Sequence, residues 1–180
     1  MRIFVFFVAI FFSCQAFGQE YLTTNGEVTF LSTAPLNEFE GKSNVLNGMV
    51  NLDSNILDFF VDLNTLKTGI GLRDSHMRES YLETDQFPFA EFTGKIAQIP
   101  TLVIGEKIPV KALGTFKIHG EEREITVAGT LAKQQNGKIT LDATFTIALS
   151  DYKIPLPSLV FYELAQEQKV TIHAVLTQKK

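Results

Sequence analysis

The three histidines, His76, His119 and His173, are the residues of this chain best suited to proton transfer or metal binding near neutral pH. They lie far apart in the sequence, and only His76 has acidic residues close by, at Asp74 and Glu79. That local group lacks the ligand spacing of a zinc site, and the charged face of a solvated helix explains it better. The sequence therefore predicts no metal ion.

The sequence also gives little support for nucleophilic catalysis or phosphate binding. Ser75 precedes His76, but adjacent residues on a helix point in different directions, so the two do not form a nucleophile and base. The Gly-Ile-Gly sequence at 69–71 lacks both the third glycine and the lysine of phosphate-binding loops. We expect a protein that is not an enzyme and needs no cofactor. A hydrolase or isomerase that uses Asp74 and His76 at a pocket mouth is kept as a rival hypothesis.

The first eighteen residues have the composition of a secretory signal peptide. Arg2 is followed by the apolar run Ile3–Phe12 and then by small and polar residues that end at Gly18. At about ten residues, the apolar run is too short to span a bilayer, which needs about 20. We expect cleavage after Gly18 and a periplasmic or secreted mature chain. The alternative is that Cys14 is lipidated and anchors the protein to a membrane.

The mature chain is mildly acidic and has no thiol. Removal of residues 1–18 takes away one arginine and no acidic residue, which changes the formal net charge from −4 to −5 and argues against nucleic acid and anionic membranes as partners. No later stretch is apolar and long enough to span a membrane. Cys14 is the only cysteine, so residues 19–180 are expected to form one domain that needs no disulfide. The sequence leaves open whether that domain is a monomer or a homodimer.

Alternation of apolar and polar residues dominates the mature chain and predicts strands with one buried face. The clearest case is Lys138–Leu149, in which Ile139 and every second residue after it are apolar. Five further segments repeat this pattern: Leu57–Leu63, Ala90–Ile96, Val110–Ile118, Arg123–Leu131 and Lys169–Leu176. Two weaker strands are expected at Glu27–Ser32 and Phe39–Leu52, the second interrupted at Gly48. About eight antiparallel strands with one apolar face close most simply into a barrel, which leaves no exposed edge.

Two segments do not alternate. Arg73–Glu83 is charged and helix-compatible, and we expect a short helix across the outside or one end of the barrel. Tyr152–Leu164 contains two prolines and several apolar residues, and we place it at the barrel mouth. His119-Gly120 and Asn136-Gly137 separate predicted strands and are typical of tight turns.

Glycines also occur inside the predicted strands. Gly94, Gly114 and Gly129 fall on the apolar face. In a barrel, such glycines permit sharp bending or leave interior volume.

Leu63–Phe92 resembles the signature region of the YceI family of polyisoprenoid-binding, lipocalin-like exported proteins. In that family a strand ends in a turn with Ser or Asn, and an Arg-Asp pair, a short helix and an acidic-aromatic-Pro step follow. The matching residues here are Asn64, Thr65, Leu66, Thr68, Arg73, Asp74, His76, Met77, Phe87, Pro88 and Phe92. Gly114–Gly120, followed by Ile125 and Val127, is similar to a later strand and turn of the family. The resemblance covers nearly the whole mature chain and implies an eight-stranded antiparallel lipocalin-like β-barrel that holds a long isoprenoid or similar amphiphile.

The chain departs from the family at one place. Many members have an Arg-Asp-Phe-Gly-like step after the penultimate strand, where this chain has Leu149–Pro155. The pocket mouth, and hence the ligand, is therefore expected to differ. Arg73 and Asp74 have two interpretations: a polar clamp for a ligand head group, or an ion pair that ties the helix to the barrel, which we favour.

Eleven residues are expected to face the barrel interior and contact a ligand, with Met77 and Tyr152 at the ends: Phe30, Phe39, Phe59, Val61, Leu63, Met77, Phe92, Phe116, Phe145, Ile147 and Tyr152. An eight-stranded barrel is either filled by side chains or holds one ligand, and Gly and Ala on the inner face favour a ligand. We therefore expect binding of a long apolar amphiphile, such as a polyisoprenoid, quinone or fatty-acid-like lipid, for carriage, storage or sequestration outside the cytoplasm. The alternative is a filled barrel that serves as a structural or protein-interaction module, with Phe60 on its outer face.

Overall fold

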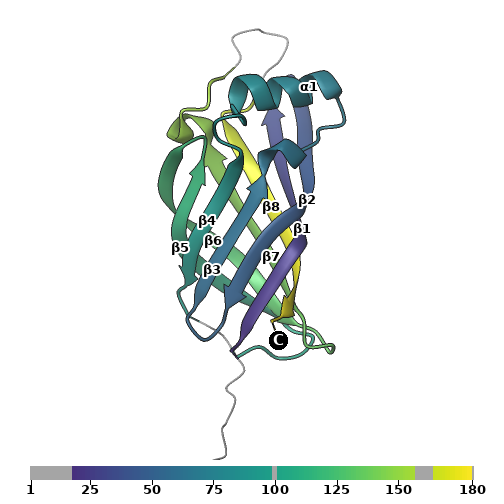
Figure 1. The fold of residues 1–180 in the computed structure, drawn as a ribbon, viewed down its shortest axis with the longest axis vertical. Coiled ribbons are helices and arrows are strands. Elements are labelled where there is room, and N and C mark those ends of the chain that lie inside the picture. Colours follow the sequence, from purple (N-terminus) through teal and green to yellow (C-terminus); the bar gives the residue numbers. More distant parts are fainter. Residues whose placement is uncertain (1–17, 99–100, 157–163, 180) are drawn as a thin grey trace, which may run out of the picture.

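The computed structural model describes residues 18–98, 101–156 and 164–179. Its strands are β1 (Glu20–Ala34), β2 (Asn37–Asn51), β3 (Ile56–Asp62), β4 (Phe89–Ile96), β5 (Lys107–Ile118), β6 (Glu121–Lys133), β7 (Ile139–Ala148) and β8 (Glu167–Gln178). Its helical segments are η1 (Leu63–Thr65), α1 (Gly71–His76), η2 (Met77–Tyr81) and η3 (Leu149–Tyr152). Each strand pairs antiparallel with the next, and β1 also pairs with β8, so the sheet closes (Figure 1). The predicted eight-stranded antiparallel barrel is confirmed.

The two ends of the barrel differ (Figure 1). One end carries α1 and the turn between β1 and β2, and is termed the helix end. The other end carries the start of β1 and the end of β8, and is termed the terminal end. The predicted helix at Arg73–Glu83 is present as α1 followed by the π-helical turn η2, and it lies across the helix end. In the described part of the chain, no helix is long and apolar enough to cross a bilayer.

The two weaker strands are longer than predicted. β1 begins at Glu20 instead of Glu27, and β2 runs without a break through Gly48. The pairing of β1 with β2 shifts register on both sides of Gly26, and the buried positions of β1 change there from odd to even numbers. Such a bulge interrupts a period of two, which is why alternation recognised only part of β1.

The tight turns are confirmed in part. His119 and Gly120 have φ values of 54° and 75°, and they alone connect β5 to β6, as a type I′ hairpin turn requires. The loop between β6 and β7 is longer and consists of residues 134–138. A hydrogen bond closes it, in which the N–H of Gln134 donates to the carbonyl of Lys138 at 2.8 Å. Of the predicted Asn136-Gly137 pair, only Gly137 has a positive φ, at 81°.

A layer of apolar side chains fills the terminal end. Val50, Leu131, Ile139 and Leu176 lie at the ends of β2, β6, β7 and β8 and are all 0% exposed. They belong to one hydrophobic cluster with the other buried apolar residues of the barrel. This terminal layer therefore closes the barrel interior on that side.

Two predicted features fall wholly or partly outside the described residues. Residues 1–17 hold Cys14 and nearly all of the expected signal peptide. Of the mouth segment Tyr152–Leu164, residues 157–163 are likewise outside, whereas η3 and Leu164 are described.

Candidate functional site

Between the terminal layer and the helix end, the barrel encloses a cavity of about 480 Å³ with an almost wholly apolar lining. All eight strands contribute side chains to it. Along β5 the lining runs from Val110 to Ile118, which is roughly 27 Å of strand at about 3.4 Å per residue. Pockets for small molecules usually measure about 300–1,000 Å³, so this cavity has room for one ligand. The interior is thus not filled by side chains, which counts against the filled-barrel alternative.

Ten of the eleven predicted interior residues line this cavity: Phe30, Phe39, Phe59, Val61, Leu63, Met77, Phe92, Phe116, Phe145 and Ile147. Tyr152 does not. It is 1% exposed, and its ring packs edge-on against Phe116 with the centroids 5.5 Å apart. Tyr152 therefore packs against a lining residue without lining the cavity itself, and contact of the other ten with a ligand stays a prediction.

Two of the cavity-lining rings lie against the backbone of a glycine on the neighbouring strand. Phe30 pairs with Gly41, and Phe59 pairs with Gly48. A Cβ added to Gly41 would be 2.5 Å from Cζ of Phe30, and one added to Gly48 would be 2.7 Å from Cγ of Phe59. Both distances are far below van der Waals contact. The missing side chains of the glycines thus let these rings lie close to the wall, which keeps the centre of the barrel open.

The glycines recognised in the sequence also lie close to a ring or to the backbone of a neighbouring strand. Gly94 and Gly114 pair across β4 and β5, and a Cβ added to either would be 2.9 Å from Cζ of Phe92. At Gly129 an added Cβ would be 2.6 Å from the carbonyl oxygen of Asp142. The expectation that these glycines leave interior volume therefore fails at Gly94 and Gly114, where the Phe92 ring and the neighbouring backbone occupy the space, whereas Gly129 lines the cavity. The alternative expectation, that they permit sharp bending of the strands, stays a prediction.

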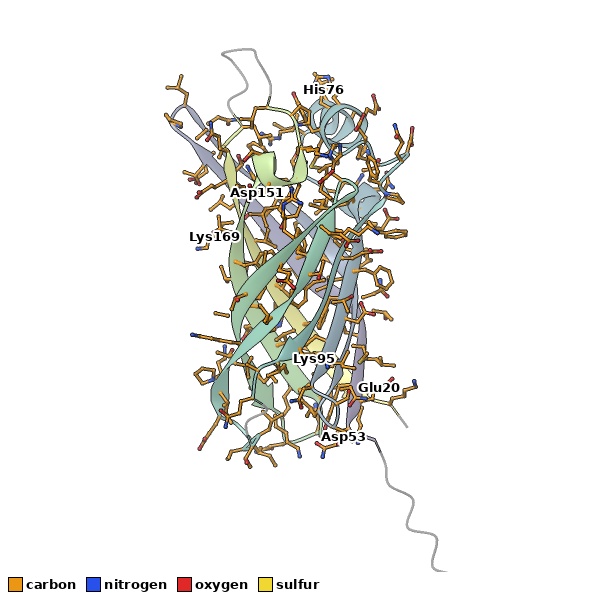
Figure 2. The ribbon with its side chains drawn as sticks, turned by 90° about the vertical axis from the view of Figure 1, so that its left-hand side faces the viewer. Glu20, Asp53, His76, Lys95, Asp151 and Lys169 are labelled. Carbon is orange, nitrogen blue, oxygen red and sulfur yellow. The ribbon has the colours of Figure 1, made fainter. Side chains whose placement is uncertain are left out.

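The cavity reaches the surface at the helix end. Ile70 and Leu72 line it and are nevertheless 53% and 61% exposed. Arg73 and His76 of α1 also line it, and Figure 2 shows His76 on the helix, at the opposite end of the barrel from Glu20 and Asp53. A ligand would therefore enter beside α1 and extend toward the terminal layer.

Arg73 and Asp74 are both held by Thr68. The backbone N–H and the hydroxyl of Thr68 donate to Oδ1 of Asp74 at 2.8 and 2.6 Å. Arg73 donates from Nε to the Thr68 hydroxyl at 3.0 Å and from Nη2 to the Thr68 carbonyl at 3.3 Å, and its guanidinium lies 4.2 Å from the centroid of the Phe39 ring. Among the described residues Arg73 and Asp74 form no direct ion pair, so the predicted ion pair is wrong. Thr68 links them instead.

Asp74 is only 6% exposed, and two opposing influences act on its pKa. Burial raises the pKa, but the hydrogen bonds from Thr68 and the positive charges of Lys67 and Arg78 outweigh burial and hold the pKa below its usual value. An ionised, hydrogen-bonded carboxylate under α1 stabilises the loop before the helix. It does not hydrogen-bond to the exposed His76, and so the arrangement gives no support to an Asp-His catalytic pair.

Within the described residues, no group of three or more His, Cys, Asp or Glu side chains is placed to hold a metal ion.

His119 joins three segments at the helix end. Its Nδ1 donates to the carbonyl of Tyr152 at 3.0 Å, and its Nε2 lies 2.8 Å from Oε2 of Glu83. The ring also packs against Phe87, with the centroids 5.1 Å apart. The turn after β5 is thereby tied to η3 and to the chain that follows η2. Sequence reasoning missed this contact because Glu83 and Tyr152 are both far from His119 along the chain.

Comparison with known proteins places this chain in a family. The YceI-like domain model matches residues 21–177. A search of curated protein sequences gave no match. A polyisoprenoid binding domain from Saccharophagus degradans, implicated in plant cell wall breakdown, has 19% sequence identity and a TM-score of 0.78 over 90% of this chain and 99% of its own. BcnA of Burkholderia cenocepacia has 18% identity and a TM-score of 0.71 over 84% and 96% of the two chains.

A third solved structure, the YCEI protein of Campylobacter jejuni, has 21% identity and a TM-score of 0.62 over 83% of this chain and 88% of its own. At these identities the structures support the fold alone. The family model is the stronger finding, since it covers nearly all of the barrel from β1 to β8. The chain belongs to the YceI-like family.

Proposed function

We propose that the protein binds one long apolar amphiphile, such as a polyisoprenoid, quinone or fatty-acid-like lipid, inside the barrel. The observation that carries the proposal is the cavity of about 480 Å³, which is apolar, closed by the terminal layer and open at the helix end. An apolar chain that enters it gains about 25 cal/mol for each Å² removed from water. The polyisoprenoid binding domain among the structural neighbours supports a ligand of this class.

The polarity of the two ends gives the ligand a direction. Beyond the cavity floor lie the fully buried Val50, Leu131, Ile139 and Leu176, and these offer no polar partner. The entrance is lined by Arg73 and His76, which can contact water and a polar head group. The apolar tail therefore points to the terminal end and the head group stays near α1. The role that we propose for such binding is carriage, storage or sequestration of the ligand.

The direct test is native mass spectrometry of the protein purified from its own host, followed by organic extraction and identification of any lipid. A stoichiometric apolar molecule, released on unfolding, is the expected result. A preparation that carries no such molecule and also fails to take up long-chain alcohols or fatty acids added in detergent would refute the proposal.

A charge placed in the cavity should abolish uptake. Phe116 and Phe145 line it and pack edge-to-face, with their centroids 5.5 Å apart. A carboxylate in this apolar site costs several kcal/mol, so Phe145→Asp and Phe116→Asp should lose ligand retention or fail to fold. Thr144→Asp is the matched control, because Thr144 neighbours Phe145 but is exposed. Retention at the wild-type level in both Phe variants would contradict the inward placement of the binding site.

We also propose that the protein acts outside the cytoplasm, in the periplasm or as a secreted protein. The support is the sequence of residues 1–18, in which a positive charge is followed by an apolar run and then by small and polar residues, as in a signal peptide. Cell fractionation together with N-terminal sequencing tests it, and a mature chain that starts at Gln19 is the expected result. A lipid-modified chain that starts at Cys14, lost in Cys14→Ser, would instead establish the membrane-anchored alternative.

A further inference from the structure

The cavity has a sharply defined floor. Leu141 of β7 and Leu131 of β6 pair across the two strands, but only Leu141 lines the cavity, and Leu131 is 0% exposed. The paired residues Leu57 of β3 and Val50 of β2 divide in the same way, since Leu57 lines the cavity and Val50 is 0% exposed. These two strand pairs lie on opposite sides of the closed barrel. The cavity therefore ends at the terminal layer on both sides.

The two ends of the cavity treat a ligand differently (Figure 1). At the floor, the terminal layer consists of apolar side chains that are fully buried, so a tail that reaches it meets packed carbon atoms. A polar head group there would lose its hydrogen bonds to water without replacement. At the helix end, Arg73 and His76 line the entrance. With the head group kept at the entrance and the tail stopped at the floor, the depth of the cavity limits how much of the tail is buried.

We propose that the terminal layer selects ligands by the length of the apolar tail. Each carbon added to a short tail removes more apolar surface from water, until the tail contacts the layer. A longer tail has to keep its extra carbons at the entrance and gains nothing from them. This inference rests on the proposed function and narrows it to amphiphiles whose tail fits the depth of the cavity. That depth is about 20 Å, because the 27 Å of β5 that line it are tilted by about 35–45° from the barrel axis.

The test measures affinity for saturated fatty acids of increasing length, from decanoic to docosanoic acid, by displacement of a fluorescent fatty acid. Wild-type affinity should rise about fourfold for each added carbon and then stop rising at one chain length, here termed the break point. Leu131→Ala removes three carbon atoms from the layer and should move the break point about three carbons longer, with little change for the shorter acids. Ala143→Leu enlarges a residue that lines the cavity and should move the break point shorter.

Two further variants guard against effects on folding. Leu113→Ala is the matched control for Leu131→Ala, because Leu113 is 59% exposed on the outer face of β5, and the break point should not move. If Leu131→Ala does not fold, Leu131→Val removes one carbon atom and should move the break point by about one carbon. General destabilisation cannot move the break point in opposite directions in Leu131→Ala and Ala143→Leu.

The outcomes separate this inference from the proposed function. A folded Leu131→Ala or Leu131→Val protein with the wild-type break point would overturn the inference while the lipid site stands. Wild-type affinity that continues to rise through docosanoic acid would do the same, since the tail would then not be stopped at the layer. Failure of all the fatty acids, and of farnesol and geranylgeraniol, to bind the wild-type protein would overturn the proposed function as well.

Discussion

Gly48→Ala should reduce the cavity without unfolding the barrel. A methyl group at Gly48 would collide with the ring of Phe59, whose Cγ would be 2.7 Å from the new Cβ. The collision involves a side chain that can rotate, and no backbone atom is among the nearest neighbours. The ring must therefore leave the wall, and because Phe59 is 5% exposed and lines the cavity, it moves into the space where a ligand would lie.

The expected loss of affinity follows from this displacement. Cδ1 and Cε1 of the ring would lie even closer to the new Cβ than Cγ does. Carbon atoms pack at about 3.5–4.0 Å, so the ring has to shift by at least about 1.5 Å. A ring that moves so far takes the room of roughly one or two methylene groups of a ligand, each worth about 0.8 kcal/mol when buried. The variant should bind a long-chain ligand about 4- to 15-fold more weakly than the wild-type protein, since 1.4 kcal/mol corresponds to a factor of ten.

Titration with a fluorescent fatty acid, together with thermal unfolding, measures both consequences. Gly71→Ala adds the same methyl group at an exposed helix residue that has open space around it, and should leave affinity unchanged. Phe59→Leu in the Gly48→Ala background removes the collision and should recover part of the loss. A folded Gly48→Ala protein with wild-type affinity would refute the view that Gly48 holds the Phe59 ring against the wall.

Two further substitutions test the stability of the site. Asp74 has a lowered pKa in the fold, so its ionised form stabilises the protein above the ordinary aspartate pKa, and this contribution is lost as the pH falls through the lowered value. Asp74→Asn should therefore cost about 1–3 kcal/mol near neutral pH and little in acid, and a Tm difference that does not depend on pH would contradict this. Gly114→Ala places a Cβ 2.5 Å from Cα of Gly94, which no rotation relieves, and should cost about 1–3 kcal/mol, or a Tm decrease of roughly 2–4 °C per kcal/mol. Calorimetry that finds an unchanged Tm for Gly114→Ala would show that β4 and β5 are not closely packed there.

The sequence predicts which way most side chains point, because a strand with one apolar face has only two choices. In β7, Ile139, Phe145 and Ile147 all face inward as alternation predicts. Alternation does not say how far along the barrel each residue lies. Ile139 belongs to the terminal layer and Phe145 lines the cavity, and this distinction depends on strand tilt and register, which appear only when the sheet is closed.

The sequence also does not reveal which residues lie opposite each other on neighbouring strands. Gly48 reads as an interruption of a strand until its partner is known to be Phe59. Gln168 is polar and precedes the predicted strand Lys169–Leu176, so alternation gave it no inward position. Its pairing with Ser32, and the contact with Ala165, place it in the wall. Tyr152 is predicted at an end of the interior, but it lies in η3 and packs against Phe116 without lining the cavity.

The cavity exists because the two halves of one barrel are packed in different ways. At the terminal end, branched residues such as Leu131 and Leu176 project to the axis and exclude solvent fully. Toward the helix end phenylalanines lie among the aliphatic lining residues, and Phe30 and Phe59 lie against glycines of the neighbouring strand. A chain with the same alternation but with larger residues at Gly41 and Gly48 would force those rings inward and fill the barrel. These glycine and phenylalanine pairs help to keep the barrel open, and hydrophobic patterning alone does not reveal them.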